Sequence, residues 1–265
     1  MNIVTSADGT RIATHSIGDG PAVVIVSGAL SRAQDAADIA RAMADAGLRA
    51  ITYDRRARGE SGDTPPAATE REIEDLAAVI ATASETGMEA GAGVAVLGHS
   101  SGAILALVAA GEGVPMSHLF LSEPPFRFGE DDPAPDLADR LQTFVDDGRP
   151  EDAVVAFQRE AVGLPEEFIE QFRSSPAFAA TASLGQSTVY DTLVTRHAST
   201  PTDAMLAVRM PVAILCGTET MPILTKAAAR LSEMMPNAEY LQVPESVGHH
   251  VHPEATARIV AERIQ

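Results

Sequence analysis

Hydrophobic residues along the chain follow two alternating patterns. The uninterrupted β-branched run at 22–26 is typical of a strand buried on both faces of a largely parallel sheet, and shorter apolar runs follow at 49–53, 93–97 and 118–122. The segment that begins at Thr69 instead has apolar residues at i, i+3, i+4 and i+7, which form one stripe along a helix. We therefore predict strands alternating with helices, the order of an α/β fold.

Turn and cap signals set the ends of several elements. The Asp8-Gly9 pair suits the positive φ angles of a tight turn and predicts an antiparallel hairpin of residues 3–6 and 11–16. Helices are expected to begin at two capping-box pairs, Ser31 with Gln34 and Thr69 with Glu72. The first of these helices is predicted to run to about Ala46, where Gly47 can stop it.

The alternation stops after residue 125. Residues 126–208 show helical patterns with acidic and proline-containing joints and no strand signal, and strand patterns return at 211–216 and 239–243. The economical interpretation is an α/β core of residues 1–125 and 209–265 with an inserted helical cap of residues 126–208. The core is predicted to be a mostly parallel sheet with helices on both faces.

Composition limits the classes of function. The chain has 265 residues, 45% of them apolar, and a formal net charge of −18, which opposes binding to nucleic acid. No apolar stretch is long enough to span a membrane and the start lacks a secretory signal, so we expect a soluble, cytoplasmic protein without a membrane partner. The lone cysteine, Cys216, excludes an intrachain disulfide and forms no metal set. The sequence carries no signal of oligomeric state.

The clearest candidate for chemistry is Ser100. It stands between glycines at −2 and +2 in the run Gly98–Gly102, after a predicted strand and before a predicted helix. This pattern is typical of a nucleophile elbow, a sharp turn that raises the serine hydroxyl above the end of the strand and frees the next amide to bind an oxyanion. A glycine-rich turn with a capping serine is the alternative, and Ser101 is the fallback nucleophile.

The sequence resembles the α/β-hydrolase superfamily over essentially its whole length. The resemblance rests on the elbow, on the segments 27–30 and 53–62 that follow two strands, and on Gly248-His249 before the last helix. It implies that Ala29 and Ser101 supply the oxyanion-hole amides, although Ser27 replaces the usual histidine. It also implies that residues 54–62 form a structural turn that holds neighbouring loops together.

A serine hydroxyl needs an imidazole to take its proton. Of the seven histidines, those after the last strand can return to Ser100, and the family's Gly-His pattern selects His249. His250 and His252 are expected to be surface or supporting residues, and His99 is expected to point away from the cleft.

The acid that orients the imidazole is not at its usual place. In many relatives the loop after the penultimate strand reads Gly-x-x-Asp, but here it is 217–220 with Thr220 at the acid position. Glu219, one place early, and Glu123, directly after the strand at 118–122, are the alternatives. Some branches of the superfamily, including zearalenone-type lactonases, carry a glutamate after that strand, and the two prolines after Glu123 would fix its backbone. We favour Glu123.

Seven of the eight phenylalanines lie in the predicted cap, where they either close an apolar pocket over the serine or simply pack a thin helical layer. Phe126, Met205 and Leu30 are the candidate substrate-binding residues.

These features predict a serine hydrolase that cleaves a small, apolar carboxylic ester or lactone through an acyl-enzyme. No cofactor or metal is expected. The alternatives are a thioesterase, an acyltransferase or a cofactor-free perhydrolase with the same triad, and a non-catalytic binding protein on the same fold. Epoxide hydrolases and haloalkane dehalogenases normally need a carboxylate at the elbow, so Ser100 argues against both.

Overall fold

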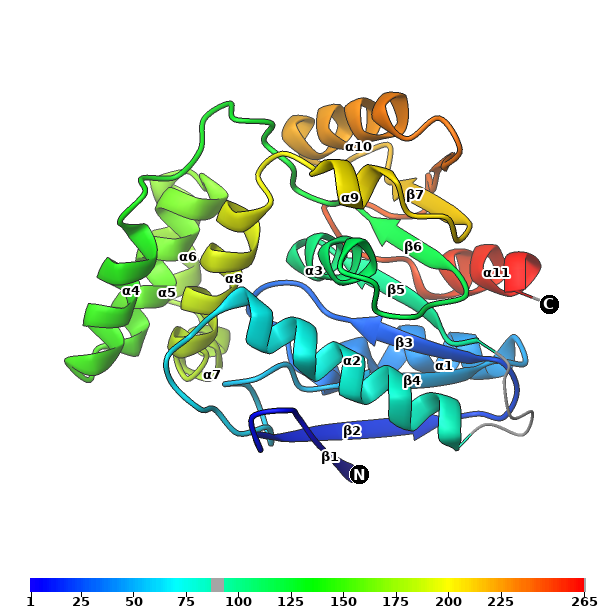
Figure 1. Cartoon of the computed structure of the whole chain (residues 1–265). Coiled ribbons are helices and arrows are strands. Elements are labelled where there is room, and N and C mark those ends of the chain that lie inside the picture. Colours follow the sequence, from blue (N-terminus) through cyan, green and yellow to red (C-terminus); the bar gives the residue numbers. More distant parts are fainter. Residues whose placement is uncertain (87–92, 265) are drawn as a thin grey trace.

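A single eight-stranded sheet forms the centre of the molecule. The computed structural model describes residues 1–86 and 93–264 (Figure 1). The strands are β1 (Asn2–Thr5), β2 (Arg11–Ile17), β3 (Ala22–Val26), β4 (Arg49–Tyr53), β5 (Ala95–His99), β6 (Leu119–Ser122), β7 (Val212–Cys216) and β8 (Glu239–Gln242). They are ordered β1-β2-β4-β3-β5-β6-β7-β8, and all pairs are parallel except the antiparallel pairs β1–β2 and β2–β4. The expected hairpin and the mostly parallel sheet are both confirmed.

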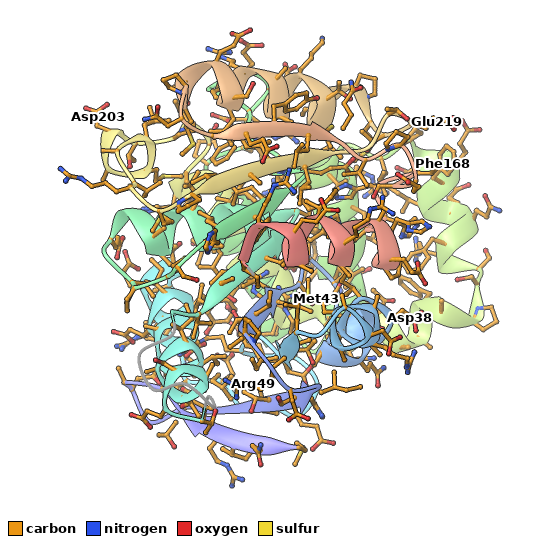
Figure 2. The ribbon with its side chains drawn as sticks, turned by 90° about the vertical axis from the view of Figure 1, so that its right-hand side faces the viewer. Asp38, Met43, Arg49, Phe168, Asp203 and Glu219 are labelled. Carbon is orange, nitrogen blue, oxygen red and sulfur yellow. The ribbon has the colours of Figure 1, made fainter. Side chains whose placement is uncertain are left out.

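Helices cover both faces of the sheet because successive side chains of a buried strand point to opposite sides. In β3, Val24 belongs to the apolar cluster on the face that α2 (Thr69–Glu85), α3 (Ser101–Gly111) and α10 (Pro222–Met234) cover. Its neighbour Val23 belongs to the apolar cluster on the opposite face, which α1 (Ala37–Asp45) and α11 (Pro253–Ile264) cover. Met43 of α1 is wholly buried in this second layer (Figure 2). The strands are therefore apolar on both sides, as the sequence pattern predicted.

The chain between β6 and β7 is helical. It contains α4 (Leu137–Asp146), α5 (Pro150–Ala156), a π-helical turn (157–162), α6 (Glu166–Arg173), α7 (Pro176–Ala182), α8 (Gly185–His197) and α9 (Asp203–Leu206). Helices α4 to α8 lie to one side of the sheet (Figure 1). Of these, α4, α5 and α8 share with the π-helical turn a small apolar cluster that includes Leu137, Leu141 and Phe157. Helix α8 also packs against α2 and α3, so this helical segment is joined to the core along α8. The domain limits at residues 125 and 209 stay a prediction.

Both capping-box predictions are wrong in detail, although a helix follows each pair. The first helical turn is a 3₁₀ turn over Ala33–Ala36, and the Arg32 amide donates to Asp35 (2.8 Å) in place of the Ser31–Gln34 pair. Thr69 is the first residue of α2, and the Glu72 carboxylate is buried against Arg55. An ion pair in the interior outweighs a bond to an amide at a helix end, which water can also satisfy.

Among the residues that the structure describes, no helix is long and apolar enough to cross a membrane.

Candidate active site

Ser100 lies at a sharp turn between β5 and α3. Its backbone has φ 55° and ψ −126°, a strained combination for a residue with a side chain. A Cβ atom at Gly98 would lie 2.5 Å from the Ala103 Cα, and one at Gly102 would lie 2.2 Å from the Val26 carbonyl oxygen. Both positions therefore require glycine, and the spacing in the sequence reflects this close packing of strand against helix.

The loop after β8 brings His249 to Ser100. His249 has φ 66°, and its Nε2 lies 3.0 Å from the Ser100 Oγ. Its Nδ1 lies 2.5 Å from Oε2 of Glu123, and a quarter of its side chain is exposed. With a proton on Nδ1 donated to Glu123, Nε2 is free to accept the proton of the serine hydroxyl.

Glu123 is almost completely buried directly after β6, with 3% of its surface exposed. Its Oε1 accepts a hydrogen bond from the Gly217 amide (2.9 Å), and its Oε2 accepts one from the Thr220 hydroxyl (3.1 Å). Burial alone would raise the pKa of Glu123, but the hydrogen bonds from His249 and the Gly217 amide, with the charge of His249, lower it overall. The carboxylate is therefore held in its ionised form.

Thr220, at the acid position of many relatives, is thus a hydrogen-bond donor to the carboxylate that comes from β6. Glu219 is exposed, and in the described part of the chain its carboxylate has no hydrogen-bond partner (Figure 2). Its backbone carbonyl instead accepts from the Gly248 amide (2.7 Å) and so supports the loop that carries His249. The structure brings Glu123, and not Glu219, to the imidazole.

The two other late histidines lie away from Ser100. His250 is exposed, and the Nδ1 of His252 accepts a hydrogen bond from the Ala255 amide (3.3 Å) at the start of α11. His252 therefore caps a helix.

Both predicted oxyanion-hole residues lie beside Ser100. A Cβ atom at Gly28 would lie 2.9 Å from the Ser100 Cβ, so the segment that contains Ala29 runs directly beside the serine. The Ala29 amide has no acceptor within residues 1–86 and 93–264. Ser101 is the first residue of α3, where amides lack intrahelical acceptors. Both amides are available to a ligand at Ser100.

His99 does not point away from the site as expected. Its ring centroid lies 4.7 Å from that of His249, and its Nδ1 shares a hydrogen bond with the Ser122 hydroxyl (3.3 Å). Burial, and after it the charge of His249, lower the pKa of His99 to about 3. His99 is therefore neutral at physiological pH and adds no positive charge beside His249.

Two of the three expected substrate-binding side chains are enclosed in the core. Phe126 is 1% exposed, and Met205 is 2% exposed and lies against Gly111, at the end of α3 remote from Ser100. Neither side chain therefore has exposed surface that a ligand could contact. The prediction failed because burial depends on tertiary packing, which the sequence pattern does not show. Leu30 is half-buried next to Ala29 and packs against the apolar cluster of the cap helices.

A buried charge network beside the elbow was missed from the sequence. The side chains of Arg55, Arg58, Glu72 and Asp191 are each at most 1% exposed, and they form ion pairs with one another. Asp191 lies on α8, far along the chain from the two arginines. The sequence did contain a signal, namely three arginines within 55–58 of a chain that is acidic overall. Arginines that become buried require carboxylate partners, so such a cluster can indicate a buried charge network.

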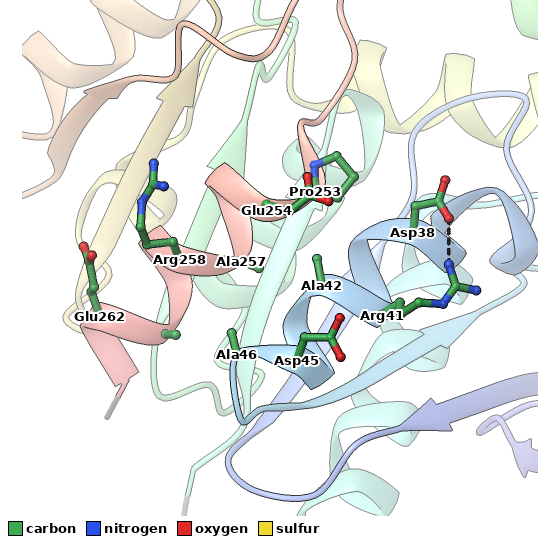
Figure 3. A pocket seen from close by; sticks show the side chains of 11 residues that line it. Asp38, Arg41, Ala42, Asp45, Ala46, Pro253, Glu254, Ala257, Arg258 and Glu262 are labelled. Carbon is green, nitrogen blue, oxygen red and sulfur yellow. Dashed lines mark hydrogen bonds and ion pairs between the residues drawn. The ribbon is translucent and has the colours of Figure 1, made fainter.

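Two grooves on the described part of the surface lie apart from Ser100, His249 and Glu123. One, of about 720 Å³, lies between α1 and α11 and is lined by charged side chains such as Asp38 and Arg258 (Figure 3). The other, of about 730 Å³, is lined by the 57–61 turn and the 183–186 segment. Within the described residues no group of three potential metal ligands occurs.

The sheet topology and a serine, a histidine and a carboxylate gathered at its carboxyl edge define an enzyme of the α/β-hydrolase fold. A family model described as the alpha/beta hydrolase family matches residues 23–262, and the chain belongs to this family. No curated protein sequence matches the chain significantly.

Solved structures show the same fold over the whole chain. An alpha/beta hydrolase from Sphaerobacter thermophilus is 37% identical with a TM-score of 0.87, covering 98% of this chain and 99% of that one. A thermophilic esterase from Thermogutta terrifontis is 20% identical with a TM-score of 0.71, covering 99% and 96%. An enol-lactonase from Burkholderia xenovorans is 14% identical with a TM-score of 0.67, covering 98% of both chains.

Proposed function

We propose that this hydrolase cleaves a carboxylic ester or lactone through an acyl-enzyme on Ser100. The observation that carries the proposal is the continuous hydrogen-bonded path from the Ser100 hydroxyl through His249 to Glu123, with distances of 3.0 and 2.5 Å. Two of the structurally similar proteins are named an esterase and an enol-lactonase, which agrees with this class of substrate.

The acylation step uses His249 as a base. As the Ser100 Oγ attacks the substrate carbonyl, Nε2 takes the hydroxyl proton, and the imidazolium that forms is stabilised by the Glu123 carboxylate 2.5 Å from Nδ1. The carbonyl oxygen becomes an oxyanion, which accepts hydrogen bonds from the amides of Ala29 and Ser101. When the intermediate collapses, Nε2 returns the proton to the departing alcohol oxygen.

Deacylation repeats these steps with water. His249 takes a proton from water, the hydroxide attacks the acyl carbonyl, and the serine oxygen leaves with the proton from Nε2. The carboxylic acid is released and the enzyme returns to its initial state. In a lactone the departing alcohol stays attached to the acyl chain, and the product is a hydroxy acid.

A fluorophosphonate probe together with Ser100→Ala tests the proposal. We expect the wild type to be labelled at Ser100 and to hydrolyse p-nitrophenyl esters or simple lactones, with kcat falling on the order of 10⁵-fold or more in the variant. The control is Ser232→Ala, which changes a serine on α10 whose hydroxyl donates to the Ala229 carbonyl of the same helix. An unlabelled, inactive wild type would favour a binding protein, and faster transfer to an added thiol, alcohol or peroxide than to water would favour an acyltransferase or perhydrolase.

A further inference from the structure

The most deeply buried carboxylate near the elbow comes from a cap helix. Asp191 lies on α8 and is 0% exposed. Its Oδ1 accepts hydrogen bonds from the Ser101 hydroxyl (2.8 Å) and from Arg55 (2.9 Å), and both its oxygens accept from Arg58 Nη2 (2.9 and 2.8 Å). One cap side chain thus contacts the elbow and two of the three arginines of the 54–62 turn, Arg55 and Arg58.

The charges of this network are balanced. Arg55 is paired with Glu72 by two parallel hydrogen bonds (2.7 and 2.5 Å), and Asp191 is the carboxylate that pairs with Arg58. Burial opposes ionisation of Asp191, but the two arginines hold its pKa below the usual value. Because guanidinium groups stay protonated, Asp191 carries a permanent charge.

Arg58 links Asp191 to the segment that carries the predicted oxyanion-hole residue Ala29. Its Nη1 donates to the carbonyl oxygens of Gly28 (2.6 Å) and Ser31 (3.1 Å). The Gly28 carbonyl and the Ala29 N–H belong to one planar trans peptide group, in which they point in opposite directions. Fixing the carbonyl toward Arg58 therefore fixes the direction of the Ala29 N–H.

The second oxyanion donor is held by the same carboxylate. The hydroxyl of Ser101 is bound to Asp191, and Arg55 donates to that hydroxyl (3.2 Å) and to the Ser27 carbonyl (3.2 Å). The Ser101 amide is thereby fixed at the start of α3. We propose that Asp191 is a positioning residue that orients both oxyanion-hole amides, so that seating of α8 on the core sets the catalytic rate. This inference rests on the proposed hydrolytic function.

Two variants test the role of Asp191. In Asp191→Asn the side-chain amide cannot balance the positive charge of Arg58. In Ser101→Ala the backbone amide of residue 101 remains, but the hydroxyl that anchors it to Asp191 is lost. A misaligned backbone amide weakens binding of the oxyanion and not of the substrate. We therefore expect kcat to fall about 100-fold in Asp191→Asn and about tenfold in Ser101→Ala, with KM within twofold of wild type. Inhibition by a trifluoromethyl ketone, which forms a tetrahedral oxyanion on the serine, should weaken by the same factors.

Asp75→Asn is the matched control. Asp75 is equally buried on α2 and pairs with Arg56 (2.8 and 2.6 Å), the residue between the two network arginines, but it contacts neither the elbow nor the 27–31 segment. Its kcat and its affinity for the trifluoromethyl ketone should stay within twofold of wild type. All variants are compared at equal folded fraction, measured by circular dichroism.

The outcomes separate this inference from the proposed function. A wild type that is neither labelled nor active would overturn both. An active wild type, with kcat in Asp191→Asn and Ser101→Ala no lower than in Asp75→Asn, would overturn the positioning role alone. A rise in KM in place of the fall in kcat, with no loss of affinity for the ketone, would also overturn it. If Asp191→Asn does not fold, Ser101→Ala decides, because it removes a hydroxyl and leaves every charge paired.

Discussion

Two buried carboxylates flank Ser100, and they are surrounded by different kinds of partner. Glu123, after β6, contacts one histidine, one amide and one hydroxyl. Asp191, on α8, contacts two arginines and one hydroxyl. In the proposed mechanism the histidine beside Glu123 gains and loses a charge during turnover, whereas the arginines around Asp191 keep theirs. The difference indicates that the first carboxylate responds to the reaction and the second holds a fixed framework for it.

Removing the charge of Glu123 should have the largest effect. In Glu123→Gln the amide cannot stabilise the imidazolium and can favour the wrong tautomer of His249, so we expect kcat to fall about 10³- to 10⁴-fold in steady-state ester hydrolysis. Glu219→Gln is the matched control, because Glu219 is exposed, and it should keep kcat within twofold. The reverse ranking would show that Glu219 moves to His249 in the working enzyme.

Removing a charge from the fixed framework should act on stability. Glu72→Gln leaves Arg55 short of one carboxylate in the interior, and we expect the free energy of unfolding in urea to fall by about 3–5 kcal/mol. The control is Asp38→Asn, which breaks the exposed Asp38–Arg41 pair and should change stability by less than about 0.5 kcal/mol. Equal losses of stability in the two variants would contradict the difference between the buried ion pairs of the network and an exposed ion pair.

The hydroxyl of Thr220 should tune Glu123 by a smaller amount. It is one of the hydrogen bonds that keep the pKa of Glu123 below 4.5, so Thr220→Val should raise this pKa and lower kcat by less than about tenfold. A lowered folded-state pKa stabilises the protein above the unfolded value and loses that effect as the pH falls through the folded value. Denaturant titrations should therefore show the variant less stable than wild type at pH 7, with the difference shrinking below pH 4.5.

The control for this titration is Thr218→Val, which changes an exposed threonine in the same loop. Its stability should follow that of the wild type at every pH. A difference between Thr220→Val and wild type that stays constant down to pH 3 would mean that the hydroxyl acts through packing and not through Glu123.

Much of the fold could be predicted because it depends on local patterns. The buried runs at 22–26 and 49–53 are strands with those limits, and the Asp8-Gly9 pair does join two antiparallel strands. The strand predicted at 93–97 instead runs from Ala95 to His99, since Gly93 and Val94 precede the first pairing with β3. The limits of such elements depend on partners that a local pattern does not contain.

The site could be predicted where a strand end or a family motif identified the residue. The ends of β5 and β6 are neighbours in a parallel sheet, which places Ser100 near Glu123. Asp191 has no signal of its own, because its partners are 90 to 136 positions away and α8 has no polar stripe that singles it out. Phe126 and Met205 were assigned to a pocket by their type and position, but depth in the core is set by tertiary packing.

The position of Glu123 at the end of β6 bears on the order in which the site assembles. Ser100 and Glu123 belong to one β5-α3-β6 unit, whereas His249 follows Glu123 by 126 residues. Synthesis proceeds from the N-terminus, so this unit can form while the histidine is still in the ribosome or untranslated. We expect the nascent chain to present the proposed nucleophile and acid without the proposed base, and hydrolytic activity to begin only when the segment after β8 docks.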